Sequence, residues 1–85
     1  MKDAQGRGVI RLGDRTTHGG EVVSAAADFK VLGKAVACEG DMATCPNCHG
    51  KHAIGAPGST RRHHGKAVAY DGDPTACGAK LISSL

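Results

Sequence analysis

The sequence predicts a mainly β fold: one small domain of short β-hairpins that repeat three times with pseudo-threefold symmetry. Three observations predict it. The chain of 85 residues spells nearly the same nine-residue segment twice and a weaker version a third time. It contains 13 glycines, which suit many tight turns. It has no Trp, one Tyr and one Phe, so its core must be thin. A domain with so little apolar material usually needs a disulfide or metal staple.

The three copies of the repeat read GRGVIRLGD at 6–14, GKAVACEGD at 33–41 and GKAVAYDGD at 65–73. Each copy ends in Gly-Asp. Because Gly permits positive φ and an Asp side chain can accept hydrogen bonds from amides two residues further on, each Gly-Asp predicts a sharp turn. A short apolar run precedes each turn, and an apolar pair follows it in HGGEVVSA at 18–25 and CGAKLISS at 77–84. Each copy therefore predicts a strand, a turn and a return strand.

A potential metal ligand lies four residues after the Asp of each copy: His18, Cys45 and Cys77. Three loop tips of a repeated unit can converge on a threefold axis, and tetrahedral zinc has such an axis through any one of its ligands. In a reducing compartment, clustered Cys and His favour metal binding over disulfides. We therefore predict one structural zinc ion, held by these three residues and a fourth.

The middle copy departs from the repeat in CPNCHGKH at 45–52, so we expect it to supply the fourth ligand. Cys48 is preferred because it has the C-x2-C spacing from Cys45 that is typical of zinc knuckles. His49 is its main rival, and His52 is a third option. The predicted set is therefore His18, Cys45, Cys48 and Cys77, with His49 as the alternative to Cys48.

Three other candidate residues are interpreted as structural. Cys38 takes the place that Arg11 and Tyr70 occupy in the other copies, so the position does not demand a ligand and a half-buried free thiol is expected. His63 and His64 lie in a basic stretch with no carboxylate partner or ligand spacing in the sequence. An exposed turn is predicted there, with a contact for a phosphate or an acidic partner as the alternative.

Composition and motifs exclude several classes of function. A closed four-ligand site leaves no open coordination position for catalysis. The chain also has no Gly-rich phosphate loop and no helical metallohydrolase motif, so we expect no enzyme. A net charge of +3 is modest and scattered and predicts an ordinary solvated surface. No apolar run of signal-peptide or membrane-spanning length is present, so we expect cytoplasmic synthesis.

The segments GKAVACEGD and GKAVAYDGD, followed by GDMATC and GDPTACGAKLISS, with GVIRLGDRTTHGGEVVSA at the front, resemble the PAAR-repeat family. Members of this family are the tip proteins of type VI secretion spikes. The resemblance covers about residues 6–85, which are expected to form a single PAAR-like domain after a flexible segment at 1–5. The Pro-Ala-Ala-Arg tetrapeptide itself is replaced by Ala35 to Cys38 and by Ala67 to Tyr70.

The resemblance implies a short cone of β-hairpins with a zinc ion near its sharp vertex. Its ligands would be the residues after each Asp, which are His18, Cys45 and Cys77, plus one of Cys48 and His49. It also implies a broad base seated on the end of a trimeric VgrG β-helix, which the tip would sharpen for membrane piercing. The resemblance also implies non-covalent attachment of toxin effectors as a further expected role. The chain would be cytoplasmic in the producing bacterium, then secreted with the spike, and would contact the target-cell membrane transiently.

The internal triplication agrees with a trimeric partner. A single chain that caps a homotrimer must offer three similar surfaces to three identical ends. Exposed strand ends of the trimer could be capped by added backbone hydrogen bonds and apolar contacts. The candidate base contacts are the apolar residues of the return strands, with filling of the thin core as an equally weighted alternative: Val22, Val23, Leu81 and Ile82.

Two other functions compete with this interpretation. The CPNCHG and RRHH stretches could belong to a small zinc-ribbon-like nucleic-acid-binding module. That module would need a second C-x2-C knuckle and aromatic stacking residues, which the chain lacks, so no nucleic-acid partner is expected. The third option is a small redox protein with rubredoxin-like iron or a reactive C-x2-C pair.

Overall fold

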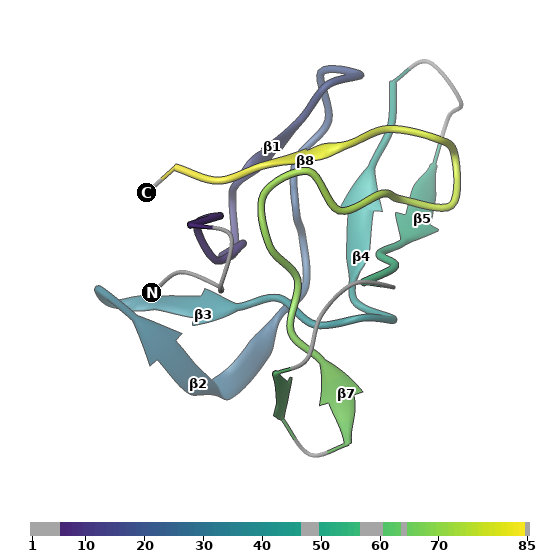
Figure 1. Cartoon of the computed structure of the whole chain (residues 1–85). Coiled ribbons are helices and arrows are strands. Elements are labelled where there is room, and N and C mark those ends of the chain that lie inside the picture. Colours follow the sequence, from purple (N-terminus) through teal and green to yellow (C-terminus); the bar gives the residue numbers. More distant parts are fainter. Residues whose placement is uncertain (1–5, 47–49, 57–60, 64, 85) are drawn as a thin grey trace.

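The computed structural model describes residues 6–46, 50–56, 61–63 and 65–84. All regular structure in these ranges is β, in four two-stranded antiparallel sheets (Figure 1). The pairs are β1 with β8, β2 with β3, β4 with β5, and β6 with β7. Within these ranges no helix has the length and apolar character needed to cross a membrane. The strands are β1 (Arg15–Thr16), β2 (Ala26–Val31), β3 (Lys34–Val36), β4 (Met42–Thr44), β5 (Lys51–Ala53), β6 (Arg62–His63), β7 (Lys66–Ala67) and β8 (Leu81–Ile82).

Each copy of the repeat folds into the same tight turn. The amide of the repeat Asp donates to the carbonyl three residues earlier, at 3.0, 3.1 and 3.0 Å in the three copies. The intervening glycines have φ of 88, 87 and 88°, a conformation that favours glycine, as in the third position of a type II turn. The Asp carboxylate also accepts a 2.8 Å bond from the amide of that earlier residue. The prediction that each Asp carboxylate accepts from amides two residues further along the chain is therefore wrong. Each carboxylate instead accepts from the amide three residues earlier and closes the turn that precedes it. The pairs are Arg11 with Asp14, Cys38 with Asp41, and Tyr70 with Asp73.

Removing one of these carboxylates should destabilise the fold. Asp41→Ala takes the acceptor from the amide of Cys38, a buried residue, and we expect the free energy of unfolding to fall by about 1–3 kcal/mol. The matched control is Asp28→Ala. The Asp28 side chain is 62% exposed and pairs with His63 at the surface, so its loss should cost less than about 1 kcal/mol. Denaturant unfolding measures both, and equal losses would contradict the role of the turn carboxylate.

The three copies surround a pseudo-threefold axis. Their fully buried equivalent residues Ile10, Ala37 and Ala69 form a closed ring of main-chain hydrogen bonds. Each amide in the ring donates to the carbonyl of the preceding copy in the cyclic order, at 2.9 to 3.0 Å. Bridges between neighbouring copies repeat the same cyclic order, which confirms the predicted pseudo-threefold symmetry. These bridges pair Arg11 with Val36, Cys38 with Val68, and Tyr70 with Val9.

The chain after each turn returns and pairs with the next copy. The last of these pairings, between β8 and β1, joins the third copy to the first and closes the cycle (Figure 1). Each return strand therefore makes two contacts. It completes the hairpin of its own copy, and it pairs with the segment that follows the Asp of the next copy. The three equivalent pairs are Val22 with Ala43, Ile54 with Thr75, and Leu81 with Thr16.

The buried hydrophobic residues of the described ranges form two small clusters. One gathers Ile10, Val22, Ala37, Ala43, Ile54, Ala69 and Leu81, and the other Val9, Val36, Cys38, Val68 and Tyr70. Two of the candidate base contacts are core residues, since Val22 and Leu81 are only 2% and 1% exposed. The prediction that they contact a partner is therefore wrong, and the core alternative holds for them. Val23 and Ile82, by contrast, are 37% and 44% exposed.

Two hairpins connect the copies. The β2–β3 and β6–β7 hairpins project at the end of the molecule away from the loops that follow β1 and β4 (Figure 1). His63 of β6 is half-buried, bonds Asp28 Oδ1 at 2.9 Å and packs its ring 4.9 Å from that of Phe29. The expectation of an exposed His63 without a carboxylate is wrong, because Asp28 comes from the other hairpin. His64 lies outside the described residues.

Candidate metal centre

Three loop tips bring His18, Cys45 and Cys77 together. One ligand atom from each residue lies within 4.8 Å of the other two. His18 follows β1, Cys45 follows β4, and Cys77 lies in the loop between the bridged residues Pro74 and Lys80. Each of these loops follows an equivalent Gly-Asp turn. The three ligand positions are therefore related by the repeat and lie at one end of the axis. The convergence that the repeat spacing predicts is present in the structure.

The distances in this group suit a tetrahedral ion. Nδ1 of His18 lies 3.5 Å from Sγ of Cys45 and 4.0 Å from Sγ of Cys77. Zinc–sulfur bonds of about 2.3 Å and zinc–nitrogen bonds of about 2.0–2.1 Å place tetrahedral N and S ligands roughly 3.6 Å apart. Cys45 is buried, whereas His18 and Cys77 are half-buried. The group can therefore hold a metal ion with little rearrangement.

Two threonines position the ligands. Thr16 and Thr75 are buried and each stands two residues before a ligand, in the first and third copies. The Thr16 hydroxyl accepts from the amide of Gly20 at 3.0 Å and from that of His18 at 3.3 Å, while the Thr75 hydroxyl lies 3.2 Å from Sγ of Cys77. Sequence reasoning missed this role, although GDRTTH and GDPTAC share the threonine at that spacing.

The pKa values of Cys77 and Cys38 are shifted in opposite directions. The Thr75 hydroxyl lowers the pKa of Cys77 to about 6, with further hydrogen bonds from Cys45, the Ala79 amide and His18, against a smaller opposing effect of burial. Cys77 is thus mainly thiolate at neutral pH, the form that binds metal. Burial raises the pKa of Cys38, which is 2% exposed and lies in the second core cluster. Cys38 is a free thiol as predicted, but it is buried rather than half-buried.

The fourth ligand belongs to the segment between Pro46 and Gly50 in our prediction. Both main candidates, Cys48 and His49, lie outside the described residues, so that choice stays a prediction. His52, the third option, lies on β5 opposite Ala43 and is not in the converging group.

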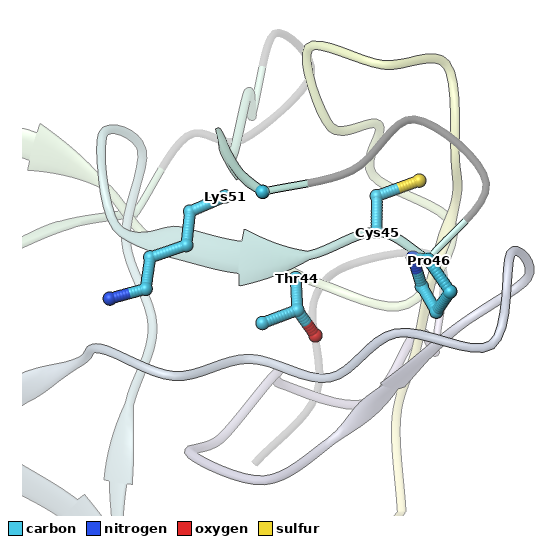
Figure 2. Close-up of a pocket in the computed structure, with 5 residues that line it drawn as sticks. Thr44, Cys45, Pro46 and Lys51 are labelled. Carbon is cyan, nitrogen blue, oxygen red and sulfur yellow. The ribbon is translucent and has the colours of Figure 1, made fainter.

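An open hollow of about 330 Å³ adjoins Cys45 and is also lined by Thr44, Pro46, Gly50 and Lys51. Figure 2 shows the Cys45 thiol and the Lys51 side chain extending in opposite directions. The Lys51 ammonium therefore points away from the sulfur and does not compete with an ion for it.

Paired substitutions test the fourth ligand. We expect Cys48→Ser to weaken metal affinity at least as much as the roughly 10–100-fold typical of lost supporting contacts around a metal, because a direct ligand is removed. His49→Gln should leave the affinity nearly unchanged. Competition with a chromophoric chelator measures both, and the cobalt-substituted protein reports the number of thiolates through its charge-transfer bands. The opposite order of effects would identify His49 as the ligand.

The fold and the site define a class: a small β domain, triplicated around an axis, with a His-Cys-Cys group at one end that can hold a metal ion. A family model of the PAAR motif matches residues 12–83, which include all three converging ligands. The chain therefore belongs to the PAAR motif family. This family is associated with the tip of the type VI secretion spike and is a structural family rather than an enzyme family. A search of curated proteins found no significant match.

Proposed function

We propose that this protein is the structural tip of a type VI secretion spike, whose end opposite the metal centre caps a trimeric VgrG-like protein. The observation that carries the proposal is the cyclic triplication. Three equivalent turns, three return strands and a closed hydrogen-bond ring repeat about one axis within a single chain. A monomer with this internal symmetry can present similar surfaces to all three ends of a homotrimer.

The metal in this proposal is one structural zinc ion. An imidazole and two thiols, one with a lowered pKa, form the donor set that zinc prefers in structural sites. A fourth ligand from Cys48 or His49 closes the coordination sphere and leaves no position for substrate. The ion would fasten the loop tips into a hard apex that pierces a membrane as the spike is driven forward.

Two of the four candidate base contacts remain candidates. Of the four candidate contacts only Val23 and Ile82 retain exposed surface, and they follow the equivalent core residues Val22 and Leu81. We infer that they contribute apolar contacts to the trimer. The tip would assemble with the spike in the cytoplasm of the producing bacterium, leave with it, touch the target-cell membrane transiently and carry toxin effectors. No nucleic acid takes part.

Binding to the cognate spike trimer tests this function. Native mass measurement of the zinc-loaded protein mixed with the trimer should give one chain and one zinc ion per trimer. Ile82→Asp should weaken the complex, whereas Lys51→Glu, on the ligand-bearing β4–β5 hairpin, should not. Failure of the fully metal-loaded protein to bind would count against the proposal. A salt-sensitive shift with DNA or RNA at physiological ionic strength would instead favour a nucleic-acid-binding module.

A further inference from the structure

The tip of the β2–β3 hairpin exposes an unusual leucine. Leu32 and Gly33 form the two-residue loop between the paired residues Val31 and Lys34. Leu32 is 81% exposed, and the other exposed large hydrophobics among the described residues range from 37% to 44%. Its φ is 52°, and in the described ranges it is the one non-glycine residue with a positive φ. Two-residue loops of this kind favour Asn-Gly or Asp-Gly, so Leu32 fits neither the conformation nor the solvent.

A hollow adjoins this leucine. It has a volume of about 450 Å³ and is lined by Leu12, Ala25, Lys30, Gly33, Lys34 and Ala35. The Leu12 side chain is 42% exposed, so the apolar surface continues from the hairpin tip into the hollow. Lys30 and Lys34 are exposed at its rim, and neither side chain forms an ion pair with another described residue. The surface is therefore apolar at its centre and positive at its edge.

Among the described residues this surface occurs once and does not follow the threefold pattern. The equivalent connector, the β6–β7 hairpin, carries His63, Gly65 and Lys66 around its tip and has no apolar residue there. A homotrimer offers three identical ends, so the symmetric features of the fold suit the trimer. In the part of the chain that the structure describes, one connector has an exposed leucine with a positive φ, and a feature that occurs once suits a partner that binds once. Residues with such strained backbone conformations are concentrated at functional sites, including ligand-binding sites.

We propose that the Leu32 tip and the adjoining hollow bind one copy of a second protein, distinct from the spike trimer, through a segment that offers apolar side chains flanked by carboxylates. Leu32 and Leu12 supply the apolar contact, and Lys30 and Lys34 pair with the flanking carboxylates. Buried apolar contact would provide the affinity, and the charged rim would select the partner. The β2–β3 hairpin projects at the end of the molecule away from the loops that carry His18 and Cys45, which is the end that the proposed function assigns to the trimer. The second protein and the trimer would therefore share that end. The distinction between them rests on the proposed function and on the departure of the Leu32 tip from the threefold pattern, whereas the binding surface itself rests on neither.

A model peptide tests the recognition chemistry. The probe is a capped hexapeptide of sequence Glu-Asp-Leu-Leu-Asp-Glu, titrated into the zinc-loaded, isotopically labelled full chain. We expect saturable amide shifts confined to Leu12, Ala25 and residues 30–35. The same peptide with Ser-Ser in place of Leu-Leu, and Lys-Lys-Leu-Leu-Lys-Lys, should bind at least about tenfold more weakly. Absence of saturation, or shifts centred on another part of the surface, would overturn the proposal.

Leu32→Asn separates binding from folding. Asn-Gly is the favoured sequence for this loop, so the variant should unfold at the same or a higher temperature than the parent protein. It should nevertheless bind the probe about tenfold more weakly or worse, as expected for the loss of one buried leucine contact. Met42→Gln removes an exposed apolar side chain on β4 and should leave probe binding unchanged. Unchanged affinity in Leu32→Asn would refute the role of the tip.

The spike trimer provides the last arm of the test. Leu32→Asn should bind the cognate trimer as the parent protein does. Loss of trimer binding, with metal content and fold intact, would place the hairpin in the trimer interface and overturn the proposal of a separate partner. If the parent protein itself does not bind the trimer, the proposed function fails. The peptide titration still decides whether the Leu32 surface binds an acidic, apolar segment.

Discussion

Cys77→Ala should remove the metal and with it most of the stability of the domain. Structural zinc contributes roughly 10–16 kcal/mol of apparent binding free energy, whereas small domains are stable by only about 5–15 kcal/mol. With each kcal/mol worth about 4–8 °C in a domain of this size, the melting temperature should fall by tens of degrees. His18→Ala and Cys45→Ala should have the same effect, because the three ligand atoms form one group.

Cys38→Ala is the matched control for the loss of a thiol. Cys38 belongs to the second core cluster and is not part of the converging group, so metal content should stay at that of the parent protein. Its small cavity should cost only about 1 kcal/mol. Elemental analysis after dialysis and thermal unfolding followed by circular dichroism measure both quantities. Equal zinc content in Cys38→Ala, His18→Ala and Cys77→Ala would show that the ligands are wrongly assigned.

The sequence contains enough information to predict the repeat and the convergence of the ligands. Gly13, Gly40 and Gly72 adopt the same positive φ, and the Asp after each closes the same turn. A ligand placed four residues beyond an identical turn reaches an equivalent point in space. Spacing alone therefore predicts that His18, Cys45 and Cys77 converge.

Other features depend on contacts that no local pattern records. Strands of two or three residues carry almost no periodic signal, so the pairing of β1 with β8, at opposite ends of the chain, could not be predicted. The hydrogen bond between His63 and Asp28 spans 35 residues and joins two hairpins. Val22 is buried and Val23 is exposed, and predicting which of the two faces the core requires the register of the return strand.

Gly20→Ala should damage the metal centre without touching a ligand. A Cβ built on Gly20 overlaps the carbonyl oxygen of Thr44 and comes within 2.6 Å of its carbonyl carbon. Both backbones are held in place: the Gly20 carbonyl accepts from the Thr16 amide at 3.0 Å, and the Thr44 amide donates to the Glu21 carbonyl at 2.8 Å. A methyl group therefore has to separate the first copy from the second. We expect a loss of several kcal/mol of stability, comparable to strong overpacking of a core.

The same separation should weaken metal binding, because Gly20 stands two residues after His18 and Thr44 directly precedes Cys45. Moving the two backbones apart pulls the imidazole away from the sulfur, and a tetrahedral site tolerates little change in ligand spacing. Gly19→Ala is the matched control. No atom lies within 4 Å of its added Cβ, so only the strain of its φ of 80° remains, at about 1–2 kcal/mol. Chelator competition should show a much larger loss of affinity in Gly20→Ala than in Gly19→Ala. Equal affinities would mean that the tips reach the ion independently of the close contact between the copies.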